Sequence, residues 1–227
     1  MPADFSGKKL GFIHAAVFTA TVAQPFIDRI LPGIETVHAG DDSIQSSNLA
    51  APVGTIPKGN YLKFANLAKS LEDYGCDLIM LACSTFNRAV EYAEPMIYTP
   101  MLQIDRPMMD KAVQDGPRVG LLATLPATVP SSERLLRRAA EDAGKDVKIE
   151  TVESAEAFKY LRAGDKDKHN QILLEEIDKL AKKVDSIVLA QLSMSALEPM
   201  IDNPPVPVYI SGVEGMTRAR EILEAQK

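Results

Sequence analysis

The chain has 227 residues, of which 46% are hydrophobic, so it can bury one large core or the cores of two smaller lobes. Its net charge of −6 argues against a nucleic-acid partner, because proteins that bind phosphate backbones usually carry basic patches. No apolar run approaches the roughly 20 residues that span a bilayer, and the N-terminus MPADFSGKK lacks the apolar core of a signal peptide, so we expect a cytoplasmic protein without a membrane partner.

Predicted strands and helices alternate along the whole chain, a pattern that is typical of open parallel α/β sheets. Gly75 predicts a helix end, and the continuous apolar run after it indicates a strand that is buried on both faces. The first half is predicted to form strand 9–14, helix 22–31, strand 34–39, a loop over 40–59, helix 60–74, strand 77–83, helix 86–94 and strand 100–104. The second half is predicted to form strand 117–123, helix 131–143, strand 147–152, helix 168–183, strand 185–190, a short helix near 196–202, strand 206–211 and helix 213–225.

Three segments of the first half recur in the second half, in the same order and at nearly constant spacing. DLIMLACSTFN (77–87) matches DSIVLAQLSMS (185–195), which places Cys83 over Gln191. The other two matches are KKLGFIHAAVFTAT (8–21) with PRVGLLATLPATVP (117–130), and PMLQID (100–105) with PVYISG (207–212). Such a repeat predicts two similar, pseudo-symmetric lobes with a cleft between them. We assign residues 1–104 and 212–227 to the first lobe and residues 105–211 to the second.

Polar side chains follow four of the predicted strands, at the sheet edge where open α/β sheets bind their ligands. They are Cys83 with Ser84, Thr85 and Asn87; His14; Thr124 with Thr128; and Gln191 with Ser193. If the two lobes face each other, these strand ends line one cleft, and their hydroxyls and helix N-termini favour a small carboxylate. The sequence has no GxGxxG or GK[ST] loop and no CxxC pair, so we expect neither an organic cofactor nor a metal.

Cys83 is the candidate reactive group. It and Cys76 lie at opposite ends of one predicted strand, roughly 20 Å apart and beyond disulfide reach, so both should be free thiols. Because a helix is predicted to begin directly after Cys83, we expect a lowered thiol pKa. Such a thiolate can take a proton from carbon, return one, or attack an activated double bond. The alternative is that Cys83 is a small buried apolar residue.

The other candidate residues also have structural alternatives. Thr124 and Thr128 bind ligand or merely cap the helix that follows them. Gln191 contacts substrate or only the backbone. His14 is a substrate-contacting or acid/base group, or a core histidine with satisfied hydrogen bonds. The methionine- and alanine-containing helices permit a homo-oligomer.

These motifs resemble the aspartate/glutamate racemase superfamily of cofactor-independent racemases, isomerases and decarboxylases. The resemblance covers nearly the whole chain and rests on the two-lobe repeat, the Cys-Ser-Thr of LACSTFN, the threonine-rich LLATLPAT, and AQLSMS at the second cysteine position. Members typically place one cysteine in each lobe, on opposite faces of the substrate α-carbon. The resemblance implies a catalytic Cys83 and carboxylate-binding roles for Ser84, Thr85, Thr124 and Thr128.

Two departures from the family pattern change what the resemblance implies. Gln191 stands at the second cysteine position, and an amide has no proton to exchange near neutral pH. The first loop, HAAVFT, lacks the acidic residue that amino-acid racemases of this family tend to carry. We therefore expect an isomerase- or racemase-like enzyme that uses Cys83 for proton transfer or addition next to the carboxylate of a small mono- or dicarboxylate. The alternatives are a one-cysteine decarboxylase of a malonate-type acid and a catalytically inactive carboxylate-binding protein.

Overall fold

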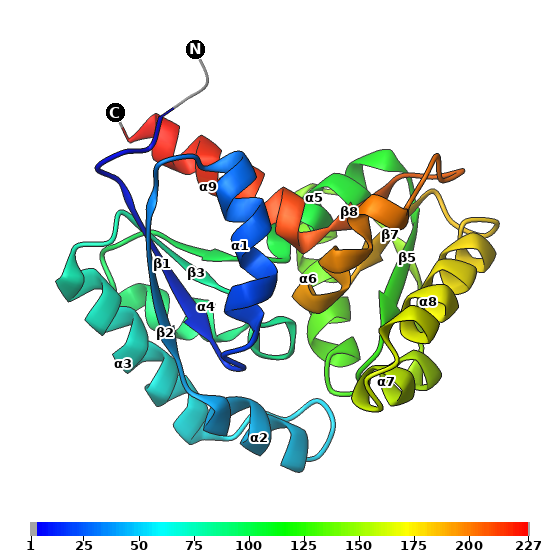
Figure 1. Cartoon of the computed structure of the whole chain (residues 1–227), viewed down its shortest axis with the longest axis horizontal. Coiled ribbons are helices and arrows are strands. Elements are labelled where there is room, and N and C mark those ends of the chain that lie inside the picture. The colour runs from blue at the N-terminus through cyan, green and yellow to red at the C-terminus, as the bar shows by residue number, and fades with distance from the viewer. Residues whose placement is uncertain (1–3, 227) are drawn as a thin grey trace.

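Within residues 4–226, which the computed structural model describes, the chain forms two four-stranded parallel sheets that are flanked by helices (Figure 1). The first sheet has the order β2-β1-β3-β4, and its strands are β1 (Lys9–His14), β2 (Glu35–Gly40), β3 (Leu78–Leu81) and β4 (Met101–Gln103). The second has the order β6-β5-β7-β8, and its strands are β5 (Arg118–Ala123), β6 (Lys148–Glu153), β7 (Ser186–Leu189) and β8 (Val208–Ile210). The predicted α/β fold with two similar parallel-sheet lobes is confirmed.

Helices cover both sheets. In the first half they are α1 (Thr19–Ile30), α2 (Asp42–Ala50), α3 (Lys58–Tyr74), the 3₁₀ helix η1 (Ser84–Phe86), α4 (Ala89–Ala93) and the 3₁₀ helix η2 (Glu94–Met96). From there onward they are α5 (Arg106–Asp115), α6 (Val129–Asp142), α7 (Ala155–Arg162), α8 (Lys166–Leu180), the 3₁₀ helix η3 (Leu192–Met200) and α9 (Ser211–Ala225). No helix in this described part of the chain is both long and apolar enough to cross a membrane.

The strand register confirms the internal repeat. Gly11 of β1 pairs with Ile79 of β3, and the equivalent Gly120 of β5 pairs with Ile187 of β7. Both glycines leave room for a helix that crosses the sheet: a Cβ at Gly11 would lie 3.0 Å from the Leu71 side chain, and one at Gly120 would lie 2.7 Å from Leu180. The same glycine therefore allows close helix–sheet packing in both lobes.

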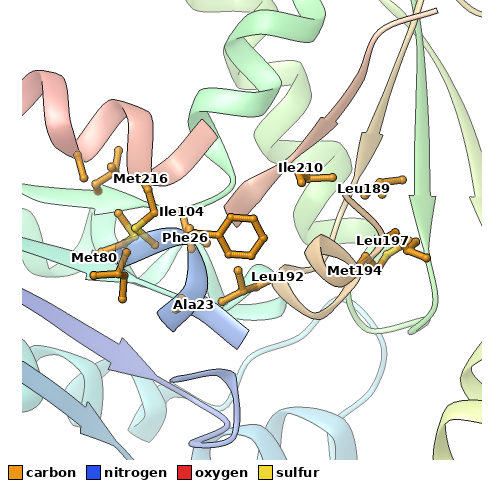
Figure 2. Packing of buried hydrophobic residues seen from close by; sticks show 14 of the residues in the cluster. Ala23, Phe26, Met80, Ile104, Leu189, Leu192, Met194, Leu197, Ile210 and Met216 are labelled. Atoms are coloured by element: carbon orange, nitrogen blue, oxygen red, sulfur yellow. The ribbon is translucent and has the colours of Figure 1, made fainter. Parts of the chain in front are cut away.

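One apolar cluster extends across both lobes. It includes Phe26 of α1, Ile104 after β4, Leu192 of η3 and Met216 of α9, as Figure 2 shows. Gly212 lets the start of α9 approach α1, since a Cβ there would lie 2.9 Å from the Phe26 ring. Because burial contributes about 25 cal/mol per Å² of apolar surface, this shared cluster stabilises the contact between the lobes.

The two lobes also contact each other through equivalent elements. Helix α1 of the first sheet's lobe contacts η3, and α6 contacts η1. Because η1 and η3 directly follow β3 and β7, these crossed contacts bring the carboxyl ends of both central strands to one cleft between the lobes.

Several predicted elements differ from the structure. The loop predicted over 40–59 is wrong, because α2 forms there; the Asp41 side chain caps it by accepting from the Ser43 N–H at 2.8 Å. The expectations also omitted α5 and α7, and the helix predicted over 86–94 divides into η1, α4 and η2. α2 buries only Ile44 and Asn48, so its sequence carries little apolar periodicity. The domain boundaries given above stay a prediction.

Candidate active site

The strand ends enclose a small cavity between the lobes, which we call the Cys83 cavity. Its volume is about 70 Å³, enough for several water-sized groups. Six of the nine predicted site residues line it: Cys83, Ser84, Thr85, Thr128, Gln191 and Ser193. The other three, His14, Asn87 and Thr124, lie behind this wall and bond to its residues or to its neighbours.

Cys83 projects from the end of β3 with extended backbone, φ −150° and ψ 108°. Its Sγ donates to Gln45 Oε1 at 3.8 Å. Cys83 is half-buried, and its loss of solvation in the small cavity raises the pKa of the thiol to about 12, although the N–H groups of Phe86 and Thr85 oppose the shift. The expected lowering of the pKa is therefore wrong: the N–H groups act in the expected direction, but desolvation outweighs them. The resting thiol is protonated at neutral pH, and both cysteines are free as predicted.

A buried carboxyl group lies behind Cys83. Asp105 follows β4 at the start of α5 and is only 1% exposed. Within the described residues, neither of its oxygens has a hydrogen bond of ordinary geometry, although the hydroxyls of Ser84 and Ser211 lie beside it. Burial raises its pKa to about 6, and the two hydroxyls oppose the shift. When Asp105 is ionised, its charge raises the pKa of the Cys83 thiol further.

Gln191 stands at the end of β7, in the place equivalent to Cys83. Its Oε1 accepts from the Thr124 backbone N–H at 2.6 Å and from the Thr124 hydroxyl at 2.9 Å. A backbone N–H can only donate, so this contact fixes which end of the amide is the oxygen. The Nε2 group of Gln191 is therefore free to donate a hydrogen bond at the cavity wall. Thr124 thus positions Gln191 and does not itself line the cavity.

Two polar contacts join the lobes beside the cavity. The Thr85 and Thr128 hydroxyls lie 3.1 Å apart. Thr128 precedes α6 but makes no side-chain capping bond, so the capping alternative does not describe its hydroxyl. Asn87 donates to the Ser131 carbonyl at 3.3 Å and accepts from Arg134 at 3.2 Å. Asn87 therefore ties η1 to α6 and does not line the Cys83 cavity.

His14 is part of a hydrogen-bonded chain that leads away from the cavity. Its Nδ1 lies 2.7 Å from the Thr19 hydroxyl, and its Nε2 lies 2.9 Å from Nδ1 of His38. Thr19 lines the cavity, whereas His38 is exposed at the surface. Burial, and secondly the nearby His38, lower the pKa of His14 to about 4. His14 is therefore neutral at pH 7 and reaches the cavity only through Thr19.

Several residues at or near this site were not among the candidates. Phe18, Thr19 and Gln45 line the cavity, and Asp105 lies behind it. Gln45 was hidden because its helix was predicted as a loop, and Phe18 because α1 begins three residues earlier than predicted. Asp105 could have been found, since it directly follows a predicted strand, as the other candidates do.

No charged side chain lines the Cys83 cavity among the described residues. A carboxylate there would be held by hydroxyls and backbone N–H groups near the starts of η1 and α6. A substrate ammonium would find no carboxylate partner in the wall. Within residues 4–226, no three His, Cys, Asp or Glu side chains are grouped to hold a metal ion.

Comparison with known proteins identifies the family. The model of the Asp/Glu/Hydantoin racemase family matches residues 17–219. The chain belongs to the Asp/Glu/Hydantoin racemase family. A glutamate racemase of Streptococcus pneumoniae serotype 19F (strain G54) is 26% identical over 216 residues, which cover 91% of this chain and 78% of that relative.

Solved structures show that the fold is shared within the Asp/Glu/Hydantoin racemase family. Glutamate racemase from Thermus thermophilus aligns with a TM-score of 0.71 at 21% identity, over 99% of this chain and 83% of that one. Picrophilus torridus aspartate racemase aligns with a TM-score of 0.66 at 19% identity, over 95% of each chain. The family match confirms the expected superfamily, and it makes this chain a racemase- or isomerase-type enzyme.

Proposed function

We propose that the chain moves a proton at the carbon next to the carboxylate of a small mono- or dicarboxylate, without a cofactor, and that Cys83 is the acid/base group. The observation that carries the proposal is the Cys83 cavity itself. A protonated thiol, hydroxyl donors and two helix starts surround a space of about 70 Å³ that no charged side chain lines.

Hydrogen bonds from the hydroxyls and N–H groups to the carboxylate would stabilise the enediolate that forms when the neighbouring carbon becomes a carbanion. In the exchange reaction, Cys83 first gives its proton to water, and the resulting thiolate takes the proton from the carbon, so that the C–H electron pair stays on the carbon and the thiol is restored. After its proton has exchanged with solvent, the thiol returns a proton to the same face of the carbon and becomes the thiolate again. Its high pKa makes it a strong base once it is formed.

A second candidate is a one-cysteine decarboxylase of a malonate-type acid. The protonated state of Cys83 and the amide at position 191 favour it, because this reaction needs an acid on one face only. The bond from the carbon to one carboxylate breaks, its electron pair stays on the carbon, carbon dioxide leaves, and Cys83 supplies the proton. The expected products are a monocarboxylate and a Cys83 thiolate that regains its proton from water.

A screen in heavy water tests the proposal. Small mono- and dicarboxylates, with and without an α-amino group, and malonate-type acids are incubated with wild-type protein and with Cys83→Ser. We expect deuterium next to the carboxylate of at least one acid with the wild type, and a loss of roughly 10²–10⁴-fold with Cys83→Ser. Release of carbon dioxide with deuterium uptake selects the decarboxylase. If the acids bind but none exchanges or loses carbon dioxide, the chain is a binding protein and the proposal is wrong.

A further inference from the structure

Three hydrogen-bonded side chains lead from the protein surface to the wall of the Cys83 cavity. His38 lies on β2, the edge strand of the first sheet, and is exposed. Its Nδ1 lies 2.9 Å from Nε2 of His14 on the neighbouring strand β1, and Nδ1 of His14 lies 2.7 Å from Oγ1 of Thr19. Thr19 begins α1 and lines the Cys83 cavity. Because both distances are those of ordinary hydrogen bonds, the three side chains form an unbroken chain.

The hydrogen bonds of this chain all point the same way. The Thr19 hydroxyl donates to the Ala16 carbonyl at 2.8 Å. A carbonyl can only accept and a hydroxyl has one hydrogen, so Thr19 accepts from Nδ1 of His14. Since the lowered pKa of His14 keeps it neutral at pH 7, its Nε2 carries no hydrogen and accepts from Nδ1 of His38. With these tautomers, which we assign from the hydrogen-bond network, both histidine N–H groups point toward Thr19.

The two histidines are held in place by packing. His14 is 1% exposed. Its ring stacks on the His38 ring with centroids 5.1 Å apart, and the Phe12 ring stacks on both. The register places His38 directly opposite Phe12. A structural role explains why each nitrogen of the buried His14 has a partner. It does not explain why one end of the chain is exposed to solvent and the other end lines the cavity.

The proposed reaction needs a route for protons between Cys83 and solvent. In each exchange cycle the thiol proton of Cys83 has to be replaced by one from water. The cavity has only about 70 Å³, the space of a few water molecules. A bound acid that fills this space displaces the water, so a route through the wall would allow exchange while the acid stays bound.

We propose that His38, His14 and Thr19 form a proton conduit between solvent and the Cys83 cavity. The inference rests on the proposed function, because the proton that the conduit exchanges is the thiol proton of Cys83. It gives a role to two histidines that do not line the cavity themselves.

The inward step shifts one proton along each hydrogen bond. Nε2 of His38 takes a proton from water, and its Nδ1 proton passes to Nε2 of His14. The Nδ1 proton of His14 passes to Thr19, whose hydroxyl releases its own proton into the cavity, toward the Cys83 thiolate. The outward step reverses these shifts and restores both tautomers. Each shift forms one bond to hydrogen and breaks another, and nothing is oxidised or reduced.

Deuterium uptake by the full chain in heavy water tests the conduit. The probe is an acid found by the exchange screen, at a saturating concentration, with wild-type protein, His38→Ala and Thr19→Val. Both variants should incorporate deuterium roughly tenfold more slowly, less than the 10²–10⁴-fold loss expected of a group that touches the carbon. The reason is that Cys83 then returns the removed proton to the carbon before it exchanges.

Imidazole separates proton transfer from a structural effect. His38→Ala leaves a gap at the surface that free imidazole can enter, so millimolar imidazole should restore its exchange rate. The same imidazole should not restore Thr19→Val, because that variant interrupts the chain inside the protein.

Thr21→Val is the matched control. Thr21 lies on the same helix, and its hydroxyl donates at 2.8 Å to the carbonyl three residues earlier, that of Phe18, as the Thr19 hydroxyl does to Ala16. Thr21 is exposed and does not line the cavity, so the variant should exchange at the wild-type rate. Melting temperatures establish that all variants fold. Nitrogen-15 NMR of the wild type should show the ring hydrogen on Nδ1 of both His14 and His38.

The outcomes separate the conduit from the proposed function. If wild type, His38→Ala and Thr19→Val exchange equally fast, the conduit is wrong and the role of Cys83 is untouched. The conduit is also wrong if imidazole fails to restore His38→Ala, if Thr21→Val is as slow as Thr19→Val, or if His14 carries its hydrogen on Nε2. If no acid exchanges with the wild type, the proposed function fails and the conduit fails with it.

Discussion

Cys83 and Gln191 occupy equivalent places in the two lobes. Each follows the third strand of its lobe in chain order and precedes a 3₁₀ helix that contacts the other lobe. The backbone is extended at both residues, with φ −150° at Cys83 and −148° at Gln191. Their side chains differ in chemistry and in neighbours. Cys83 lies beside the buried Asp105, whereas the oxygen of Gln191 is tied to Thr124.

This difference shows that the duplicated backbone supplies the position of a side chain but not its chemistry. A thiol can exchange a proton at the substrate carbon, and an amide near neutral pH can only form hydrogen bonds. The site is therefore asymmetric in proton transfer although it is symmetric in fold. The predictions below test this asymmetry.

The largest effect is expected when the reactive thiol of Cys83 is removed. Cys83→Ser should reduce exchange or product formation roughly 10²–10⁴-fold, because a hydroxyl is a far weaker acid/base group at this position. Its free energy of unfolding should change by only about 1 kcal/mol, as the volume is nearly kept. Cys76→Ser is the control: Cys76 is buried at the far end of β3, and the substitution should affect stability alone. Equal activity losses in the two variants would remove Cys83 from the mechanism.

Asp105→Asn tests the buried carboxyl group behind Cys83. The folded-state pKa is about 6 against a usual value of 3.8, so its stabilising contribution is complete below pH 3.8 and is lost as the pH rises through 6. Relative to wild type, the unfolding free energy of the variant should therefore rise by about 2 kcal/mol between pH 4 and pH 8. Denaturant titrations across this range measure the gap, and a gap that does not change with pH would contradict the raised pKa.

His14→Gln tests a pH dependence of stability that is opposite to that of Asp105→Asn. The pKa of His14 is lowered from 6.5 to about 4, so its contribution is present above pH 6.5 and is lost as the pH falls through 4. Relative to the variant, wild-type protein should lose roughly 3 kcal/mol of unfolding free energy between pH 7 and pH 3.5. Parallel unfolding curves of the two proteins at all pH values would show that His14 is not kept neutral by burial.

The smallest effect is expected when a thiol is introduced at position 191, the place equivalent to Cys83. Gln191→Cys places a thiol where the equivalent strand end already points into the cavity, so deuterium should begin to enter a bound chiral carboxylate from the second face. The gain should be slight, because Leu192 follows position 191, whereas the hydroxyl-bearing Ser84 follows Cys83. Enantiomeric excess and deuterium content, compared with those of the wild type on the same acid, measure it. An unchanged enantiomeric excess would mean that a thiol at this position does not suffice.

The sequence predicted the architecture well because repeated apolar strands determine it. The matching segments around Cys83 and Gln191 anticipated the equivalent strand ends, and the glycine after helix 60–74 does adopt the left-handed conformation of a helix end, with φ 89°. Most polar residues placed at strand ends do reach one cavity. These features depend on local patterns that a single sequence contains.

The sequence did not predict features that depend on packing between segments distant in the chain. The raised pKa of Cys83 follows chiefly from desolvation in the folded protein, which outweighs the local helix start. The contact of Gln45 with Cys83 requires α2, a helix with only Ile44 and Asn48 buried. The pairing of Gln191 with Thr124 depends on the register between β5 and β7, which no single segment specifies.

The face from which deuterium arrives tests the central claim most directly. Wild-type protein is incubated in heavy water with a single enantiomer of an acid that the exchange screen has identified, or with a prochiral malonate-type acid, and the labelled product is resolved by NMR. One-sided proton transfer by Cys83 predicts deuterium on one face only, and Cys83→Ser should abolish it. Deuterium on both faces with loss of enantiomeric excess in the wild type would contradict the account, because a second group would then supply the proton that Gln191 cannot.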